Sequence, residues 1–140
     1  MQADCESTYI HSVEDNVSKI EQQSAWLAEI ADVPVGFCLA LAGRSEPDPV
    51  FVQLVAVVPL ARRRGAGLAL LRAVSEQYPQ RNVVMATRDD NVAAQQLNLR
   101  FAKSIGGVLR RVPVRRYRRA DLGFAQGERH RPWVIDRSPD

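Results

Sequence analysis

The sequence has few cysteines and no long apolar run. Only Cys5 and Cys38 occur among 140 residues, and their spacing matches no metal motif, so we expect neither a disulfide framework nor a metal site. No run of about 18 apolar residues exists, and the first residues lack the basic and apolar regions of a secretory signal. These absences predict a cytoplasmic protein without a membrane span, in which Cys38 is a buried, reduced thiol.

Lysine is almost absent, since seventeen of the nineteen cationic side chains are arginines. The charges are unevenly distributed. Residues 1–50 carry nine acidic and two basic side chains, about −7, whereas residues 51–140 carry seventeen basic and seven acidic ones, about +10. This asymmetry predicts a basic face that attracts a polyanion, and nucleic acid is one such ligand.

The length and composition are those of a folded domain. A chain of 140 residues is long enough for one core but not for two, and 46% hydrophobic and 25% charged residues are ordinary for a globular protein. We therefore expect residues 1–140 to form a single domain.

The stretch that organises the chain runs from residue 51 to residue 77. Phe51 to Val58 is an almost unbroken apolar and β-branched run, typical of a strand that is buried on both faces. Leu68, Leu71 and Val74 then recur on one stripe of a helix that should stop near Pro79. The stretch predicts a strand, a short turn and an amphipathic helix.

The turn between this strand and this helix has the features of an anion site. Gly65 and Gly67 permit a tight turn and a close approach of backbone N–H groups to a ligand, and Arg62, Arg63 and Arg64 lie beside them. No Gly-Lys-Ser/Thr follows, which excludes a nucleotide P-loop, and the third glycine of a dinucleotide fingerprint is missing. The anion is therefore of another kind.

The stretch resembles the acyl-CoA-binding motif of the GNAT acetyltransferase superfamily. That motif is Arg/Gln-x-x-Gly-x-Gly/Ala, and Arg62, Gly65 and Gly67 occupy its positions. Val57, Pro59, Leu68 and Leu71 match its usual surroundings. The resemblance implies an α/β fold with a central mixed sheet flanked by helices, in which acyl-CoA binds at a splayed parallel strand pair.

The remaining elements before the motif fit this fold. Residues 24–42 read as a β-hairpin with a turn at 32–36, and 43–49 as a loop. Residues 7–10 are typical of an edge strand, and Val13 to Gln23 of a short helix capped by Ser12. The helical region before the hairpin, about residues 1–23, is shorter than in the family, so one wall of the acceptor cleft is abbreviated or comes from another subunit.

After the motif, a second block of residues resembles the family's Asn-x-x-Ala-x-x-Leu-Tyr helix. Residues 82–87 read as a strand parallel to 51–58, and 91–102 as a helix in which Asn91, Ala94 and Leu97 match the family pattern. The core of the resemblance covers residues 24–110. Beyond it we expect C-terminal strands within 108–137: a strand over 108–117 that is interrupted or bent at Pro113, a loop over 120–132, and a short strand at 133–135.

The resemblance implies which residues hold acetyl-CoA, the acyl donor; no metal is implied. The expected contacts are backbone groups of the strand for the pantetheine amides, N–H groups and arginines of the loop for the pyrophosphate, and an asparagine for pantetheine. These residues are Val55, Val57, Arg62, Arg63, Arg64, Gly65, Ala66, Gly67, Leu68, Ala69 and Asn91.

The acid and the base of the reaction stay open. Many family members protonate the leaving thiolate with a helix tyrosine, but Asn98 occupies that position and can only donate a hydrogen bond, so Tyr117 or water is the alternative acid. The family often has a glutamate on the strand before the loop, where this chain has Gln53. Candidate bases are Glu29, His130, Asp89 and Asp90, with a relay of waters as the alternative.

Six arginines surround Tyr117 within residues 110–119. They fit a solvated edge strand, the recognition of an acidic acceptor, or the binding of nucleic acid. We predict an N-acetyltransferase that transfers the acetyl group of acetyl-CoA to a primary amine of a small-molecule or peptide acceptor, with a homodimer as one arrangement. The alternatives are an acyl-CoA-binding sensor without turnover and a nucleic-acid-binding protein.

Overall fold

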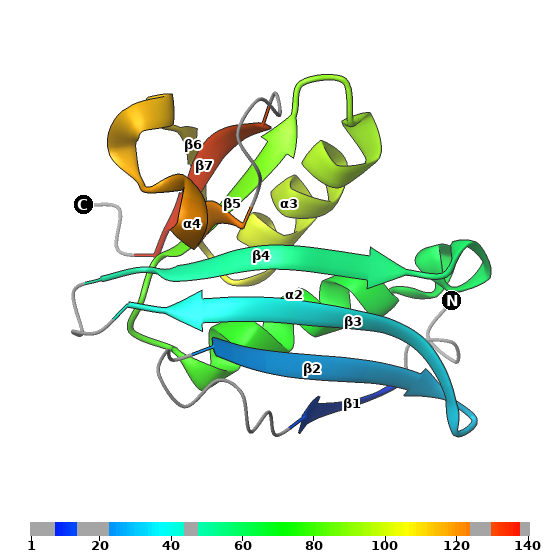
Figure 1. Ribbon diagram of the computed structural model, residues 1–140. Helices are drawn as coiled ribbons and strands as arrows, with labels where there is room; N and C mark the ends of the chain where they lie inside the picture. Colours follow the sequence, from blue (N-terminus) through cyan, green and yellow to red (C-terminus); the bar gives the residue numbers. More distant parts are fainter. Residues whose placement is uncertain (1–7, 14–22, 44–47, 124–129, 138–140) are drawn as a thin grey trace.

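The computed structural model describes residues 8–13, 23–43, 48–123 and 130–137. Within these residues, seven strands form one mixed sheet in the order β1-β2-β3-β4-β5-β7-β6, in which only β4 and β5 are parallel (Figure 1). The strands are β1 (Thr8–Val13), β2 (Gln23–Ile30), β3 (Val33–Ala42), β4 (Val50–Val57), β5 (Val83–Arg88), β6 (Val108–Arg111) and β7 (His130–Asp136). The helical elements are η2 (Pro59–Arg64), α2 (Ala66–Gln77), α3 (Val92–Ser104), η3 (Val114–Arg116) and α4 (Arg119–Leu122).

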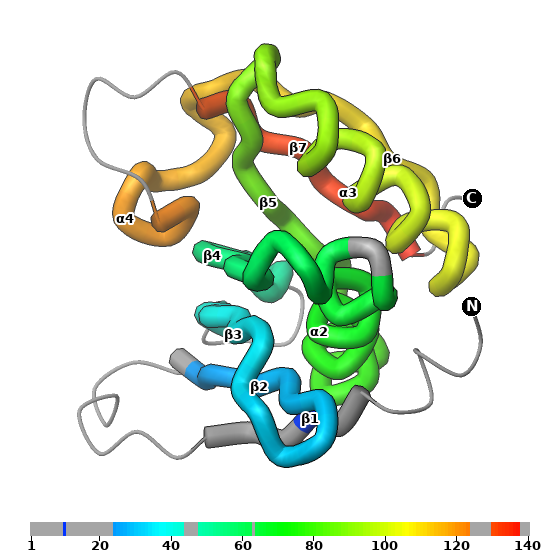
Figure 2. Tube along the Cα trace, turned by 90° about the vertical axis from the view of Figure 1, so that its right-hand side faces the viewer, coloured from blue at the N-terminus to red at the C-terminus, as the bar shows by residue number. Residues whose placement is uncertain are grey.

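The two faces of the sheet are covered differently. Figure 2 shows α2 and α3 on one side of the sheet and α4 on the other. We call these sides the helix face and the open face. The helix face carries the main core, whose fully buried side chains include Leu70 and Val74 of α2, Phe101 of α3 and Ile135 of β7. Burying each of these side chains contributes about 1.5–3 kcal/mol, so this layer dominates the stability of the fold.

A smaller cluster lies on the open face. Phe51, Val84 and Val134 of the central strands pack there against Leu122 of α4. Figure 1 looks onto this face, where β2, β3 and β4 lie in front of α2. Among the described elements, η3 and α4 cover it only beside β4, β5 and β7.

The elements of the central stretch confirm the predictions from the sequence. The predicted strand over 51–58 is β4, and the predicted helix that stops near Pro79 is α2, which ends at Gln77. Leu71 and Val74 are buried as expected, whereas Leu68 is half-buried. The predicted strand over 82–87 is β5, and it pairs in parallel with β4.

The hairpin over residues 24–42 is also confirmed, with a tighter turn than predicted. Ala31 (φ 51°) and Asp32 (φ 65°) both adopt the left-handed conformation, which is typical of a two-residue hairpin turn whose twist matches that of the strands. Helix α3 begins where the sequence predicted, because the Asn91 side-chain oxygen accepts the Ala94 N–H at 3.0 Å.

At the N-terminal end, the predicted edge strand is confirmed and the predicted helix after it is wrong at its ends. Residues 7–10 were expected to start an edge strand, and β1 is the edge strand of the sheet. The helix predicted from Val13 to Gln23 is wrong at its ends, because Ser12 and Val13 extend β1 and Gln23 begins β2. Residues 14–22 lie outside the described part.

The strand predicted over 108–117 is also wrong beyond Arg111. Proline cannot donate a ladder hydrogen bond, and after Pro113 the chain forms η3 rather than a bent strand. The loop predicted over 120–132 contains the end of α4, and β7 begins already at His130. The predicted strand at 133–135 is confirmed as part of β7, which inserts between β5 and β6.

Cys38 is buried in β3 and free, as predicted. Burial away from water disfavours the thiolate and raises the pKa of the Cys38 thiol to about 12. The thiol is therefore a small apolar core group at neutral pH. None of the described helices combines the length and the apolar character that crossing a membrane requires.

Candidate active site

The parallel strands β4 and β5 separate after a short ladder. Their register pairs are Val50 with Val83, Phe51 with Val84, and Val52 with Met85. On the other edge of β4, Leu54 pairs with Leu39 and Val52 with Ala40, so Gln53 is an extra residue in the β3–β4 ladder. Such a β-bulge bends its strand, and it lies directly after the last β4–β5 pair. The bulge accounts for the divergence of β4 from β5 that Figure 1 shows.

Beyond the bulge, β4 presents backbone polar groups to the gap. Gly36 pairs with Val57, and the Val58 N–H donates to the Val35 carbonyl at 2.8 Å. Because an antiparallel ladder alternates between residues that bond to one neighbour and residues that face away, the N–H and C=O groups of Val55 and Val57 point away from β3. The gap is therefore lined by backbone donors and acceptors at the spacing of alternate strand residues.

The N-terminus of α2 opens into the same gap. Gly65 (φ 79°) adopts the left-handed conformation, and no side chain caps the helix. The Ala69 N–H donates to the Gly65 carbonyl at 2.9 Å, which is the first hydrogen bond of the α2 ladder. The N–H groups of Ala66, Gly67 and Leu68 lie before this bond in the chain. The first turn has no acidic residue. The positive end of the helix dipole and these N–H groups suit an anion.

Gly67 also lies at the contact between the two helices. A Cβ atom at this position would lie 3.1 Å from Leu97 Cδ2 of α3. Leu97 is half-buried against the main core, so a side chain at residue 67 would require Leu97 to shift by a few tenths of an ångström. The glycine therefore serves the helix contact as well as the turn.

These elements enclose a cleft of about 1290 Å³, which we call the splay cleft. It passes between β4 and β5, from the N-terminus of α2 on the helix face to Leu122 and Gly123 beside α4 on the open face. Its walls are the second half of β4, the end of β5, the first turn of α2, and one stripe of α3 that includes Ala94, Leu97 and Asn98. A ligand in this cleft would touch both faces of the sheet.

Two buried polar side chains line the splay cleft. Thr87 on β5 is 8% exposed and Asn98 on α3 is 7% exposed. The Thr87 hydroxyl oxygen is buried and has no hydrogen-bond partner among the described residues. A buried hydroxyl without a partner costs about 1–3 kcal/mol, which a hydrogen bond to a ligand would offset. The pair marks the interior of the cleft as the place where a polar group of a ligand binds.

The charged side chains that line the cleft are all basic. They are Arg62, Arg88 and Arg100, and His130 lies with them. No aspartate or glutamate is among the described residues that line it. Arg62 turns back onto β4, where its Nε–H donates to the Val57 carbonyl at 3.1 Å. The cleft is thus suited to an anionic ligand.

Of the four candidate bases, His130 alone lines the cleft. Asp89 binds Arg111 (2.6 Å) and Arg131 (2.9 Å), and the Asp90 carboxylate is held by Arg88 through two hydrogen bonds of 3.0 and 3.1 Å. Glu29 lies on β2, outside the lining residues. His130 begins β7 beside Arg88.

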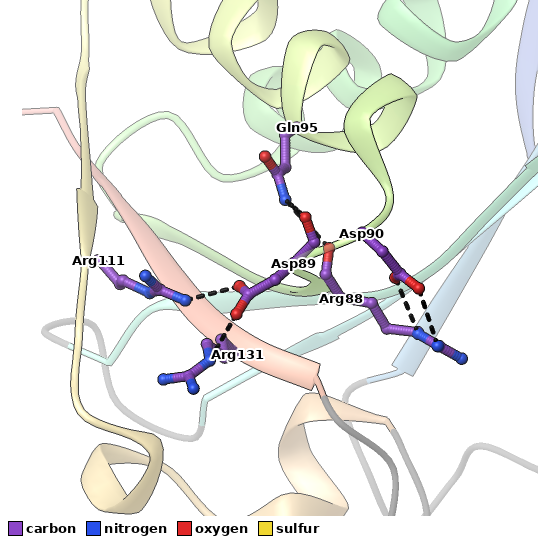
Figure 3. A network of polar contacts seen from close by, with 6 residues as sticks. All are labelled: Arg88, Asp89, Asp90, Gln95, Arg111 and Arg131. Atoms are coloured by element: carbon purple, nitrogen blue, oxygen red, sulfur yellow. Dashed lines mark hydrogen bonds and ion pairs between the residues drawn. The ribbon is translucent and has the colours of Figure 1, made fainter.

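The two aspartates instead stabilise the end of β5. Figure 3 shows Asp89 between Arg111 of β6 and Arg131 of β7, while the Gln95 amide donates to the carbonyls of Arg88 and Asp89 at 3.0 and 2.9 Å. This network joins the β5–α3 turn to the β6–β7 pair. It holds one rim of the splay cleft, because Arg88 and Asn91 in this turn both line the cleft.

The structure brings together most of the ligand-binding residues predicted from the sequence. Those that line the cleft are Val55, Val57, Arg62, Gly65, Gly67, Leu68 and Asn91. Ala66 and Ala69 belong to the first turn of α2 without lining the cleft, and Arg64 lies on η2, exposed and outside the lining. The predicted contact of the Arg63 side chain lies outside the described part of the structure.

The two predicted catalytic residues are placed apart. Asn98 lines the cleft, but Tyr117 does not, because its ring packs on the open face edge-on against Phe51, with ring centroids 5.3 Å apart. Thr87 and Arg100, which also line the cleft, were not predicted from the sequence. Arg100 continues the spacing of Ala93 and Gln96 along α3, which could have identified it, whereas no local pattern distinguishes Thr87 from an ordinary strand residue.

Comparisons with known proteins agree with this geometry. Residues 2–102 match the family model described as the acetyltransferase (GNAT) family. Comparison with curated proteins finds no match. Among solved structures, the diaminobutyrate acetyltransferase EctA of Paenibacillus lautus, in complex with L-2,4-diaminobutyric acid and coenzyme A, is similar at 25% identity. The match covers 83% of this chain and 71% of that one, with a TM-score of 0.63.

Two further structures show the same fold at lower identity. An acetyltransferase of Bacillus subtilis in complex with CoA is 16% identical, with 92% of this chain and 98% of that chain covered and a TM-score of 0.64. The ribosomal-protein-S18-alanine N-acetyltransferase of Escherichia coli is 16% identical, with 91% of each chain covered and a TM-score of 0.58. The chain belongs to the GNAT acetyltransferase family. It is a GNAT-type acyltransferase.

Proposed function

We propose that this enzyme transfers the acetyl group of acetyl-CoA directly to a primary amine. The observation that carries the proposal is the splay cleft, which runs from an uncapped helix N-terminus on one face of the sheet to Leu122 and Gly123 beside α4 on the other. A donor and an acceptor that enter from opposite faces would meet between β4 and β5. The solved structures with coenzyme A bound support acetyl-CoA as the donor.

The donor would bind through backbone groups and arginines. The N–H groups of Gly67 and Leu68 would bind the pyrophosphate, and Arg62 and Arg100 would add charge-assisted hydrogen bonds of about 1.5–3 kcal/mol each. The gap-facing groups of Val55 and Val57 would pair with the pantetheine amides. Asn91 lines the cleft and caps α3, so it can do both.

The reaction requires a hydrogen-bond donor for the thioester, a proton source for the leaving thiolate and an acceptor for the amine proton. The amine nitrogen attacks the thioester carbonyl carbon, the carbon–sulfur bond breaks, and the thiolate leaves and takes a proton from water. Asn98 and Thr87 can each donate a hydrogen bond to the reacting thioester or the thiolate, although neither can supply a proton near neutral pH. His130 would accept the proton of the amine, because among the candidate bases it is the one that lines the cleft.

Calorimetric titration with acetyl-CoA tests the proposal. We expect micromolar binding that Ala69→Glu weakens at least about tenfold, since a carboxylate at the start of α2 competes with the pyrophosphate for the helix N-terminus. Gln77→Glu makes the same change in charge at the exposed end of the same helix and should bind normally. Absence of binding by the wild-type protein would refute the proposal.

Turnover separates the enzyme from the sensor. Release of the CoA thiol should depend on an added primary amine and should fall when His130 is replaced by glutamine. Binding of acetyl-CoA without thiol release in a broad screen of amines would favour a sensor. A single domain over residues 1–140, a cytoplasmic location and a homodimer stay predictions from the sequence.

A further inference from the structure

We propose that the acceptor amine is carried by an acidic polypeptide segment, which docks on the open face beside the splay cleft. This inference rests on the proposed function and assigns its acceptor. It depends on an arginine-bearing wall, an apolar floor next to it, and the continuity of both with the cleft.

The wall is formed by residues 114–119, which we call the arginine wall. Arg115, Arg116, Arg118 and Arg119 are all exposed there. The Arg118 side chain is 81% exposed, and its ion pair with Asp121 is long, at 3.9 Å. Arg115 and Arg119 have no ionic partner among the described residues. Four arginines against one aspartate leave this segment with a surplus of positive charge that no ion pair among residues 8–13, 23–43, 48–123 and 130–137 neutralises.

The arginine wall is held firmly against the sheet. Tyr117 packs edge-on against Phe51 at 5.3 Å, and Leu122 of α4 is 2% exposed because it packs on the central strands. The Gln53 amide donates to the carbonyls of Ala120 and Asp121 at 3.2 and 3.1 Å. Gln53 and Leu122 also line the splay cleft, so the segment that presents the arginines is anchored next to one side of the cleft. A partner bound to these arginines would lie next to the cleft.

The floor beside the wall is apolar. Phe37 of β3 is 40% exposed and Leu54 of β4 is 44% exposed. Register pairs place Phe37 opposite Ala56, and Leu54 opposite Leu39, and paired residues share one face of the sheet. Ala56 and Leu54 line the splay cleft, so the apolar floor runs into it. Such a surface fits a polypeptide with apolar as well as acidic side chains, rather than a small hydrophilic amine.

The aromatic contacts favour carboxylates over nucleic acid. Binding of single strands normally uses an exposed aromatic face on which bases stack. The Tyr117 ring is covered by the Arg116 guanidinium at 4.7 Å and by Phe51, and the Trp133 ring is covered by Arg111 at 5.5 Å. Guanidinium groups without such an aromatic partner still bind carboxylates through paired hydrogen bonds. The arginine wall is therefore better suited to an acidic peptide.

Paired peptides test the inference. Each probe carries a free amino terminus, one lysine and a leucine, and the two differ only in three glutamates replaced by three glutamines. We expect kcat/KM of the wild-type enzyme to be at least about tenfold higher for the glutamate peptide. The double variant Arg115→Glu/Arg119→Glu should reduce this ratio to about one, whereas Arg72→Glu, an exposed arginine of α2, should keep it.

Calorimetry of each variant with acetyl-CoA shows that it is folded and keeps the two proposals apart. Normal acetyl-CoA binding with equal rates for the two peptides would overturn the acidic acceptor and leave the acetyltransferase intact. A glutamate preference that survives in the double variant would also overturn it, because the arginine wall would then not be its source. Salt-sensitive binding of a single-stranded oligonucleotide that the double variant loses would assign the wall to nucleic acid instead. Absence of acetyl-CoA binding would refute the proposed function itself.

Discussion

Thr87 and Asn98 are two polar side chains that the fold buries inside the splay cleft. Ser75, the other buried polar residue of the described part, is satisfied within its own helix, since its hydroxyl donates to the Arg72 carbonyl at 2.9 Å. The Thr87 hydroxyl has no such partner. A fold that leaves one buried donor unpaired at the centre of its cleft keeps that donor available for a ligand.

Replacement of Thr87 by valine should separate ligand binding from folding. Valine has nearly the same shape, so the free energy of unfolding should stay the same or rise slightly, because the unpaired buried hydroxyl is removed. Acetyl transfer should fall about tenfold in kcat/KM, the effect of one hydrogen bond of about 1.4 kcal/mol. Thr87→Ser is the control and should retain most of the activity. Unchanged kinetics of Thr87→Val would show that the hydroxyl does not contact the reacting groups.

Cys38 gives the protein a pH-dependent stability at the alkaline end. Burial raises the pKa of this thiol from 9.0 in the unfolded chain to about 12 in the folded protein. The folded state therefore holds the proton more tightly, and the stability present below pH 9 is lost as the pH rises toward 12. Between pH 8 and pH 10 the thiol should lower the free energy of unfolding by about 1.4 kcal/mol.

Urea unfolding at the two pH values measures this loss. The measurement compares a Cys5→Ala protein with Cys5→Ala/Cys38→Ala, so that Cys38 is the only thiol that differs. The alanine variant is less stable at both pH values because of its smaller side chain, but the additional alkaline loss should be absent from it. Equal pH dependence of the two proteins would mean that the Cys38 thiol is accessible to water in the folded state.

The elements differ in how far the sequence predicts them. Strand β4, helix α2, strand β5 and helix α3 follow from local apolar patterns and from the caps and turns that bound them, and all four were predicted within two residues. The insertion of β7 between β5 and β6 is set by contacts between residues that are distant in the chain, which periodicity does not report. For the same reason the sequence could not tell that Tyr117 faces Phe51 rather than the cleft.

The residues of the site also differ in how far the sequence predicts them. The loop over residues 62–68 carries a motif whose spacing has a direct structural meaning, and its Arg62, Gly65, Gly67 and Leu68 line the cleft. The choice among His130, Glu29, Asp89 and Asp90 needed the fold, because all four have a residue type fit for a base. Their burial and partners, such as the two arginines that hold Asp89, are tertiary properties.

Gln53 links the bulge of β4 to α4, and its replacement should affect the acceptor side alone. Gln53→Met keeps the length of the side chain but removes the hydrogen bonds to the Ala120 and Asp121 carbonyls. We expect a loss of about 1 kcal/mol of stability and a several-fold rise in KM for the acceptor, with unchanged affinity for acetyl-CoA. Gln77→Met on the exposed end of α2 should change neither quantity. A weaker affinity for acetyl-CoA with unchanged acceptor KM would contradict this division of the cleft.

The whole molecule consists of two halves of one sheet. Strands β1–β4 pack with α2, and strands β5–β7 lie beside α3. The halves are joined by the three β4–β5 register pairs, by the contact between α2 and α3, and by α4, which packs on both β4 and β5. Figure 2 shows the two helices side by side, each next to its own half. A ligand in the splay cleft touches β4 and α2 of one half and β5 and α3 of the other. Acetyl-CoA should therefore act as an additional connection between them.

Hydrogen exchange of the backbone amides should record this connection. Without ligand, the gap-facing amides of Val55 and Val57 have no strand partner on the β5 side, so we expect them to exchange faster than those of the β5–β7 ladder. Acetyl-CoA at about 100 times its dissociation constant stabilises the folded state by about 2.7 kcal/mol, which should slow globally exchanging amides about 100-fold. The amides of Val55, Val57 and the first turn of α2 should gain at least that much, because the ligand also bonds to them directly. If protection rose uniformly through the molecule, with no additional gain at these amides, acetyl-CoA would bind outside the splay cleft and the two halves would be joined by the protein alone.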